Sequence, residues 1–410
     1  MNVRRTAALL AATAVIGTAA PAVADDADTS PSPSPSVAIP SGLYGSTDPT
    51  YDGVWRQSLA LLAQHTVGVK PAAESVDWLV GQQCAEGAFP AYRADAMAQC
   101  DAKTQVDTNS TAAAVQALAA LGGHEAETVH AVRWLKDAQN EDGGWGYTAD
   151  GPSDTNSTSV VVGALAAVGD DPADQRSKKG NSPYDALRTL AVPCGKDDGG
   201  AYAYQPDEKG ALTANADATA AAVLAGLGKG FVAEAGKAGG KAECADGEDV
   251  SPADAAQGGV AYLTGALAKD GYLKSALAGA EDQPDYGNTA DAVVALAAAG
   301  AKDSTGEPLA WLEKNAPTWA VQAGPAAYAQ LVFAAHATGT DPRDFGGTDL
   351  VEKLNATGPA PEKAESSAAS EEEKSEDDGS VFGAWWYVVV FLIAGAGIGF
   401  LISGRRKQQP

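Results

Sequence analysis

The sequence contains 410 residues, and its 53 acidic side chains outnumber its 28 basic ones, which gives a formal net charge of −25. Most of this negative charge falls between residues 29 and 360, and a surface of that sign repels nucleic acid and anionic lipid headgroups. Nucleic acid is therefore excluded as a partner.

The first 24 residues have the features of a secretory signal peptide. Two arginines precede an apolar run at residues 7–20, and small residues at 22–24 form a cleavage site. We therefore predict a mature chain that begins at Asp25. It continues with a Ser/Pro-rich linker over residues 25–42, which contains the stretch SPSPSPS.

The other end of the chain predicts a membrane anchor. Residues 383–403 carry no charge, and at about 1.5 Å per residue they span a bilayer core of about 30 Å. The basic cytoplasmic tail of residues 404–410 follows as a positive-inside signal, and the acidic, Ser-rich residues 358–382 predict a disordered spacer before the anchor. These features predict a single-pass type I protein of the cell membrane with an extracellular folded part.

Between these ends, residues 43–357 contain six copies of one pattern, which is typical of a repeat architecture. Residues 107–122 read DTNSTAAAVQALAALG, and residues 154–169 read DTNSTSVVVGALAAVG. Each copy begins with capping residues, continues as an Ala-rich apolar run and stops at Gly, as expected for a helix buried on all sides. Looser copies lie at residues 53–68, 213–228, 285–300 and 324–339.

Amphipathic segments alternate with the buried ones. The segment ETVHAVRWLKDAQ, residues 127–139, carries Val129, Val132 and Leu135 on one stripe and charges on the other face, as in a half-exposed helix. Six such segments, without any alternation typical of strands, predict an all-α fold in one domain. The predicted architecture is an α/α toroid with six inner and six outer helices.

Four cysteines in an exported chain predict two disulfide bonds, for which three pairings are possible. Cys84 and Cys100 flank one loop, while Cys194 and Cys244 lie in two later loops. We therefore favour Cys84 with Cys100 and Cys194 with Cys244. Oxidised pairs are neither nucleophiles nor zinc ligands, and no metal site is predicted.

The turn that follows the best amphipathic segment resembles the QW repeat of the prenyltransferase and squalene-cyclase superfamily. The matching residues are Trp134, Gln139, the Gly143-Gly144 pair and Trp145. This resemblance covers the whole repeat region and implies the same α/α toroid. Trp134, Gln139 and Trp145 are expected to be structural, with Trp145 packing back on Gln139 and on the outer helix.

The motifs that catalyse reactions on this fold are absent from the sequence. It has no DxDD or DCTAE acid motif, no complete DDxxD magnesium motif, no Asp-x-Cys zinc pair and no GCGEQ thioester motif. We therefore expect a protein that is not an enzyme. Two alternatives stay open: a terpenoid-cyclase- or prenyltransferase-like enzyme without the standard acids, and a structural or adhesion module.

The starts of the inner helices carry more polar residues than capping requires, since one good side-chain cap is enough. Several of these helix starts converge on one rim of a toroid, so their remaining polar groups would line the mouth of a central cavity. The sequence therefore predicts a ligand-binding rim. Its residues are Asp107, Thr108, Asn109, Asp154, Thr155, Asn156, Asn215, Asp217, Tyr286, Asn288, Thr289 and Asp291.

Within the superfamily, these segments resemble the non-catalytic transcobalamin and intrinsic-factor group. The Asp-Thr pairs at 107–108 and 154–155 are similar to its DTxxMA-like segments, and residues 287–289 are similar to its GNxxST-like segments. The resemblance implies capture of a small or medium organic ligand, with cobalamin as a candidate cargo and a membrane transporter as a candidate partner. No bound cofactor is expected. The β-rich second domain of that group has no counterpart in this sequence.

Overall fold

Twelve α-helices are found in the computed structural model, which describes residues 38–237, 242–247, 249–276, 280 and 282–363. Six of them correspond to the repeated apolar segments: α1 (Gly53–Thr66), α3 (Thr108–Leu121), α5 (Thr155–Ala167), α7 (Ala216–Gly226), α9 (Tyr286–Ala298) and α11 (Pro325–Thr338). The other six alternate with them: α2 (Ala73–Gly81), α4 (Glu125–Asp137), α6 (Pro183–Leu190), α8 (Pro252–Leu267), α10 (Gly306–Ala323) and α12 (Leu350–Asn355).

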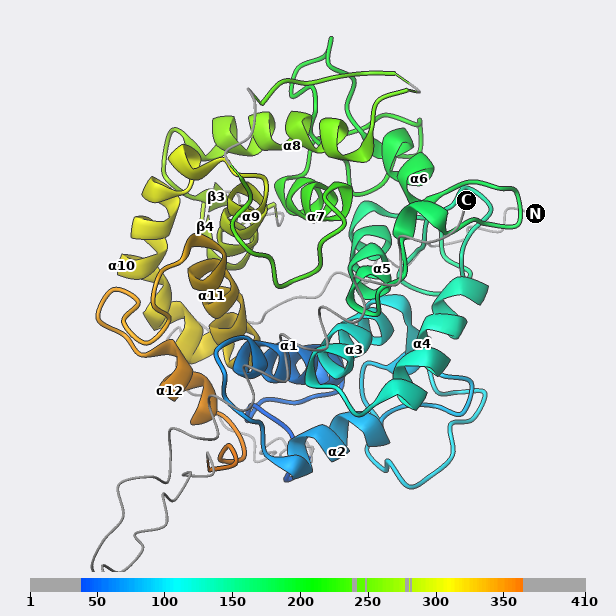
Figure 1. Ribbon diagram of the computed structural model, residues 1–410, viewed down its shortest axis with the longest axis vertical. Coiled ribbons are helices and arrows are strands. Elements are labelled where there is room, and N and C mark those ends of the chain that lie inside the picture. Colours follow the sequence, from blue (N-terminus) through cyan, green and yellow to red (C-terminus); the bar gives the residue numbers. More distant parts are fainter. Residues whose placement is uncertain (1–37, 238–241, 248, 277–279, 281, 364–410) are drawn as a thin grey trace, which may run out of the picture. The chain divides into compact units, whose positions relative to one another are not determined.

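The odd-numbered helices form a closed inner ring within the unit that ends at Glu362 (Figure 1). Each one packs against the next from α1 to α11, and α11 packs against α1. The even-numbered helices lie outside this ring, where α4 contacts α3 and α5, and α8 contacts α7 and α9. The all-helical prediction is therefore confirmed, and the inner and outer helices alternate as the repeats predict.

Burial distinguishes the two layers. In α3, every residue from Ser110 to Leu118 is buried, because this helix has neighbours on all sides. In α4 only Thr128, Ala131, Val132 and Leu135 are buried. Val129 was predicted to lie on this stripe, and that prediction is wrong. Its side chain is 64% exposed because the buried stripe passes through Thr128 instead.

The strands in the described residues are all two residues long and join the loops that lead into inner helices. β1 (Phe89–Pro90) pairs antiparallel with β2 (Val106–Asp107), directly before α3. β3 (Leu273–Lys274) pairs antiparallel with β4 (Pro284–Asp285), directly before α9. These pairings were not predicted, because two residues are too few to show an alternating pattern.

Both predicted disulfide bonds are present. Cys84 is bonded to Cys100 within the connection between α2 and α3, with 5.5 Å between their Cα atoms. Cys194 is bonded to Cys244, with 5.6 Å between their Cα atoms, and joins the loop after α6 to the segment before α8. The pairing prediction is confirmed.

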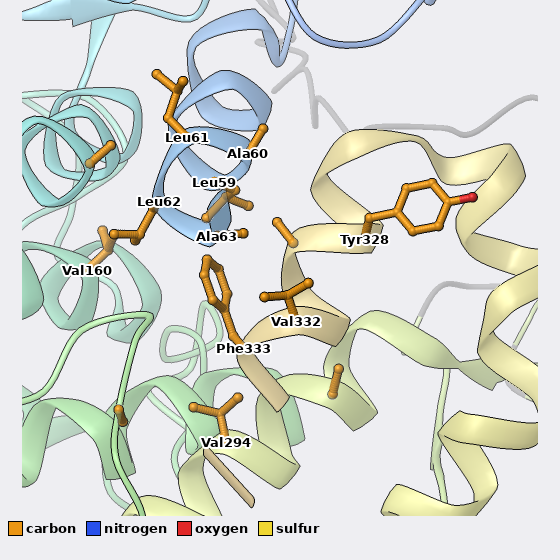
Figure 2. Close-up of a cluster of buried hydrophobic side chains, with 14 of the residues drawn as sticks. Leu59, Ala60, Leu61, Leu62, Ala63, Val160, Val294, Tyr328, Val332 and Phe333 are labelled. Atoms are coloured by element: carbon orange, nitrogen blue, oxygen red, sulfur yellow. The ribbon is translucent and has the colours of Figure 1, made fainter. Parts of the chain in front are cut away.

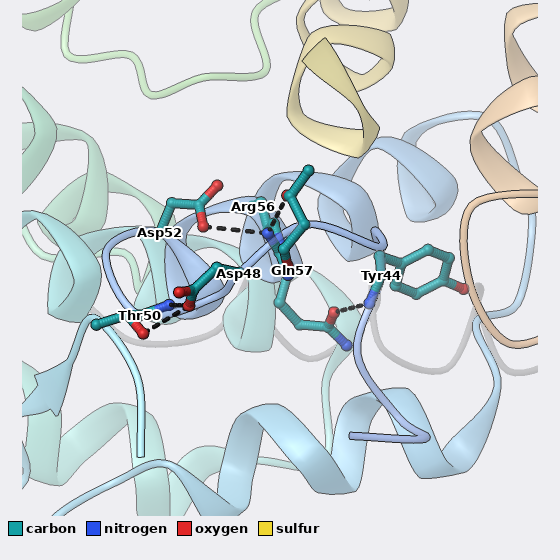
Figure 3. A network of polar contacts seen from close by, with 7 residues as sticks. Tyr44, Asp48, Thr50, Asp52, Arg56 and Gln57 are labelled. Atoms are coloured by element: carbon teal, nitrogen blue, oxygen red, sulfur yellow. Dashed lines mark hydrogen bonds and ion pairs between the residues drawn. The ribbon is translucent and has the colours of Figure 1, made fainter. Parts of the chain in front are cut away.

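The segment before α1 is held by side chains of that helix (Figure 3). Arg56 is only 1% exposed, and it donates hydrogen bonds to the carbonyl oxygen of Thr47 (2.9 Å) and to Oδ1 of Asp52 (3.2 Å). Gln57 Oε1 accepts the backbone N–H of Tyr44 (2.9 Å), whose hydroxyl donates to the carbonyl oxygen of Pro359 (3.2 Å). The two ends of the ring unit therefore meet beside α1.

The predicted signal peptide, anchor and cytoplasmic tail lie outside the described residues, as do most of the predicted linker and spacer. Among the helices that are described, none has the length and apolar character needed to cross a bilayer. The membrane topology stays a prediction from the sequence.

Candidate ligand-binding site

The first residue of each polar cluster serves as a helix cap. Asp107 Oδ1 accepts the N–H of Ser110 (2.6 Å), and Asp154 Oδ1 accepts the N–H of Ser157 (2.7 Å). Asn215 caps α7 in the same way. These side chains satisfy backbone donors that a helix start leaves unpaired, so the capping role accounts for them.

The fourth residue after each cap ties the incoming loop to the inner helix. In four repeats this residue is Thr, and its hydroxyl accepts the backbone N–H of a buried loop residue at 2.9 to 3.0 Å. The pairs are Thr111 with Phe89, Thr158 with Trp145, Thr219 with Tyr202, and Thr289 with Leu273. The predicted site residue Thr289 therefore holds a loop in place.

Trp145 shows how such a loop is anchored. Its indole is fully buried, and Nε1 donates to the carbonyl oxygen of Leu135 in α4 at 2.6 Å. Gln139 Nε2 donates to the carbonyl oxygen of Gly143 (2.7 Å), which holds the turn that precedes the indole. Trp134, which is partly buried, packs against the core. The three QW residues thus hold α4, the turn and the start of α5 together.

The first helical residues are directed away from the ring centre. Thr155 Oγ1 donates to the carbonyl oxygen of Ala203 (2.6 Å). Tyr286 stacks on Trp311 and Trp319 of the outer helix α10, at centroid distances of 4.9 and 5.4 Å. Thr108 is fully buried. These three predicted site residues do not line the central cavity.

A cavity of about 310 Å³ lies inside the ring, and all six inner helices contribute to its wall. Five of the predicted site residues line it: Asn109, Asn156, Asp217, Asn288 and Asp291. Three polar wall residues on the inner helices were not predicted, namely Gln116, Ser159 and Gln330, and Lys229 after α7 was not predicted either. A signal for the helical ones was present in the sequence: Gln116 and Gln330 are polar residues within apolar runs, and Ser159 directly follows the polar cluster at residues 154–158.

Apolar side chains form the rest of the wall. Figure 2 shows Phe333 projecting from α11 toward Leu59 of α1, with Val294 of α9 and Val160 of α5 nearby. All four residues line the cavity. A ligand in this space would therefore meet apolar surface as well as the polar groups of the helix starts.

Residues 229–237, here called the closing segment, follow α7 and run over the interior of the ring in Figure 1, and the first three of them, residues 229–231, line the cavity. Phe231 packs edge-on against Trp55 at 5.3 Å, and its N–H donates to Gln116 Oε1 (3.0 Å). A Cβ on Gly230 would lie 2.1 Å from that same Oε1 atom, so a larger residue here would displace the Gln116 side chain and its hydrogen bond to Phe231. Farther along, Glu234 Oε1 lies 3.0 Å from His336 Nε2 near the end of α11.

Two carboxyl groups face the cavity from neighbouring inner helices. Asp217 Oδ2 accepts Nδ2–H of Asn156 (2.5 Å), and Asp291 Oδ2 accepts Nε2–H of Gln330 (2.9 Å). Burial, followed by the charge of Asp217, raises the pKa of Asp291 to about 8, despite the hydrogen bond from Gln330. Burial also raises the pKa of Asp217. Asp291 is therefore largely protonated at neutral pH.

Several oxygen atoms in the cavity wall have no hydrogen-bond partner among the described residues. They are Oγ of Ser159 and the side-chain carbonyl oxygens of Asn109 and Asn156. Ser159 is only 5% exposed. A buried polar atom left unsatisfied costs about 1–3 kcal/mol, and native proteins contain few of them. Three such atoms around one cavity therefore mark a part of the wall where hydrogen-bond partners from outside the chain would fit.

The described residues contain one cluster of potential metal ligands, formed by Cys194, Cys244 and Asp246. Its two cysteines are joined in a disulfide bond, and Asp246 accepts the N–H of Cys194 at 2.9 Å. These contacts explain the cluster without a metal ion.

No protein-family model matches the chain, and no curated protein matches it. Similar solved structures include a type II terpene cyclase, MstE from Scytonema, in its apo form. It is 16% identical, with 66% of this chain and 72% of the cyclase covered and a TM-score of 0.43. A sugar epimerase from a ruminal bacterium is 14% identical, with 67% of this chain and 80% of that chain covered and a TM-score of 0.42. TM-scores this low carry no information about function.

Proposed function

We propose that this protein is a non-catalytic, ligand-binding α/α toroid, tethered outside the cell membrane, that takes a small organic molecule into the centre of its ring. The supporting observation is the set of unpartnered oxygen atoms on Asn109, Asn156 and Ser159 around a partly apolar cavity. A site of this kind combines apolar walls with a few convergent polar groups, as ligand pockets commonly do.

The volume of the cavity narrows the choice of ligand. About 310 Å³ lies at the lower end of the range of about 300–1,000 Å³ that is usual for ligand pockets. This volume supports a compact ligand. A corrinoid is several times larger, so cobalamin stays a prediction from the resemblance alone, and so does delivery to a membrane transporter.

The test is native mass spectrometry of the purified full-length chain, to detect a retained small molecule, followed by calorimetry with that molecule. If none is retained, thermal shift with cobalamin, terpenoids and compact amines, alcohols and acids takes its place. Asn156→Ala should weaken binding by about 1–3 kcal/mol, the cost of an unmet polar partner.

Asn215→Ala is the matched control for the binding test. It removes a helix cap outside the cavity and should cost about 0.5–2 kcal/mol of folding stability. The affinity for ligand should stay unchanged in this variant. If no compound binds and the only phenotype of both variants is lower stability, the ligand-binding proposal is wrong and a structural module is left.

The protonated state of Asp291 favours one alternative, a terpenoid-cyclase- or prenyltransferase-like enzyme. A carboxyl group that holds its proton at neutral pH within a partly apolar cavity could transfer that proton to a bound alkene. The carbocation formed would close on a second double bond of the same molecule, and loss of a proton back to the carboxylate would give a cyclic alkene. Incubation with a short linear isoprenoid such as geraniol, followed by chromatography with mass spectrometry, tests this function. Any product should disappear in Asp291→Asn, and the absence of product from folded protein would exclude the alternative.

A further inference from the structure

We infer that the ligand of the central cavity is an organic cation, whose ammonium or guanidinium group is bound by Asp217 and Asp291 and whose apolar body lies against Leu59 and Phe333. This inference rests on the proposed ligand-binding function and specifies the chemistry of the ligand. It is carried by three features of the cavity: its charge, its hydrogen-bond acceptors and its apolar wall.

The charge of the cavity is the first feature. Asp217 on α7 and Asp291 on α9 belong to adjacent inner helices and line the same cavity. Within the described part of the chain, neither forms an ion pair with a basic side chain. Lys229 also lines the cavity, but it is an exposed residue. Two half-buried carboxyl groups without a cation are costly to ionise, and a positively charged ligand would offset that cost.

The hydrogen-bond acceptors are the second feature. Asn156 and Gln330 each direct an amide N–H to one of the two carboxyl groups, which leaves the carbonyl oxygen of Asn156 without a partner. Gln116 has both of its amide atoms engaged, with Nε2 donating to the carbonyl oxygen of Val160 and Oε1 accepting from Phe231. The buried wall atoms left without a partner are therefore two amide carbonyl oxygens, which only accept, and the Ser159 hydroxyl, which can accept or donate.

A ligand that satisfies several acceptors must carry several donors on one head group. An ammonium group offers three N–H donors and a guanidinium group offers five, and neither has an acceptor. Asn156 supplies a carbonyl oxygen next to Asp217, Asn109 supplies another from α3 in the same cavity, and the nearly buried hydroxyl of Ser159 adds a third polar group to the wall. An anionic ligand would be repelled by the carboxyl groups and would leave these carbonyl oxygens unpaired.

The apolar wall is the third feature, and it favours an organic cation over a metal ion. Calcium takes about six to eight oxygen ligands at about 2.3–2.6 Å. The described residues bring no three His, Cys, Asp or Glu ligands together around Asp217 or Asp291. The side chains of Leu59, Val294 and Phe333 offer apolar contact instead. A compact aromatic or aliphatic body attached to an amine fits both parts of the cavity.

The test uses three probes that differ mainly in charge: tryptamine, which is a cation, tryptophol, which is neutral, and indole-3-acetate, which is an anion. Their affinities for the purified full-length chain are measured by calorimetry at pH 8, and the set is repeated with the smaller phenethylamine, phenethyl alcohol and phenylacetate. The amines should bind roughly 10–100-fold more tightly than the alcohols, as expected for hydrogen bonds to charged groups. The acids should bind most weakly.

Asp217→Asn and Asp291→Asn should each remove most of the preference for the amine, while the affinity for the alcohol changes less than threefold. Both changes are nearly isosteric, so the variants should fold. Asp137→Asn is the control, because Asp137 is exposed on the outer helix α4, and it should keep the full preference.

The outcomes separate the inference from the function on which it rests. Equal binding of the alcohol and the amine would overturn the cationic ligand but leave the ligand-binding toroid. Competitive displacement of tryptamine by Ca²⁺ or K⁺ at micromolar concentrations would replace the organic cation by an inorganic one. If none of the six probes binds, the cationic-ligand inference is wrong. The search for a retained molecule then decides the proposed function independently.

Discussion

The α3–α5 side and the α7–α9 side of the ring share one framework but present different chemistry to the cavity. On both sides a side chain caps the helix, and a Thr four residues later accepts an N–H from the incoming loop. Two residues after the cap, however, α5 has Asn156 and α7 has Asp217. Six residues after the cap, α5 has Val160 and α9 has Asp291.

The difference separates positions that build the ring from positions that face its centre. Caps and Thr ties connect α3, α5, α7 and α9 to their incoming loops, so they repeat over these four helices. Apart from Gln116, which binds the closing segment, the cavity-facing positions make no such connection and can vary. The α3–α5 side therefore presents neutral amides and a hydroxyl, and the carboxyl groups lie on the α7–α9 side. Four predictions probe this separation.

The largest effect is expected at the loop anchor of the α3–α5 side. Trp145→Ala removes a fully buried indole and should lower the free energy of unfolding by about 3–5 kcal/mol. Trp145→Phe keeps an aromatic ring and loses the Nε1 hydrogen bond to Leu135. It should therefore cost about 1–3 kcal/mol, because the carbonyl is left unpaired. Urea denaturation measures both, and a loss below about 1 kcal/mol for Trp145→Ala would contradict the anchoring role.

The second largest effect is expected from the disulfide bonds, one on each side of the ring. Cys194 and Cys244 are 50 residues apart in the sequence, and Cys84 and Cys100 are 16 apart. We assume that each bond acts by restricting the unfolded chain. Replacing both cysteines of one bond by Ser should then lower the free energy of unfolding, by about 4 kcal/mol for the longer loop and about 3 kcal/mol for the shorter one. Denaturation midpoints of the two double variants test this order. The reverse order would show that local contacts, rather than loop length, decide.

The carboxyl groups make the α7–α9 side sensitive to pH. The groups whose charges act on Asp291 are Asp217 and Asp285, while its partner Gln330 from α11 is neutral and Lys229 lines the same cavity. Its pKa of about 8 in the folded state exceeds that of the unfolded chain, so the folded state holds the proton more firmly. The contribution of Asp291 to the free energy of unfolding should therefore fall as the pH rises from about 4 to about 8, by at most about 1.4 kcal/mol per pH unit.

Asp291→Asn removes this titration. Thermal denaturation at pH 5, 6, 7 and 8 should show that the variant gains stability relative to the natural protein as the pH rises, with the largest gain at pH 8. Parallel curves for the two proteins would mean that the carboxyl group titrates normally. The exposed Asp137→Asn change should give no such difference.

The smallest effect is expected from two adjacent residues of α5, one that ties a loop to the helix and one that faces the cavity. Thr158 accepts the N–H of Trp145, whereas the hydroxyl of the adjacent Ser159 has no partner within the part of the chain that the structure describes. Thr158→Val should cost about 1–3 kcal/mol, because a buried donor is left unpaired. Ser159→Ala should change stability by less than about 0.5 kcal/mol. Chemical denaturation compares the two, and a loss above about 1 kcal/mol for Ser159→Ala would mean that its hydroxyl has a partner within the fold.

Much of the architecture could be predicted because six segments of the sequence carry the same pattern. Ala-rich runs between a cap and a Gly identify the inner helices, and the loop positions of the cysteines identify the disulfide pairs. Val129 was misplaced because apolar spacing alone does not decide between Thr128 and Val129 on a stripe. The closing segment could not be predicted, because residues 229–237 match no other repeat.

The candidate site was predictable only in part, because five consecutive polar residues point in different directions around a helix. The cap Asp154 is turned to the backbone, Thr155 to a neighbouring loop and Asn156 to the cavity. Whether a side chain faces the cavity depends on the position of the ring axis relative to its helix, and the sequence alone does not give that position. Gln116 and Gln330 were overlooked because they lie inside the helices rather than at their starts.

Closure of the ring by α1 and α11 has a consequence for how the chain folds. These helices are among the first and the last of the unit, yet they pack directly against each other. An open array of repeats can grow outward from any nucleus and needs capping units at its ends. A closed array has no ends, but its last contact joins residues that lie more than two hundred positions apart. Contacts this distant slow folding, so the apolar flank of α1 stays uncovered until α11 has docked, and a chain shortened by one repeat would leave two such flanks without partners.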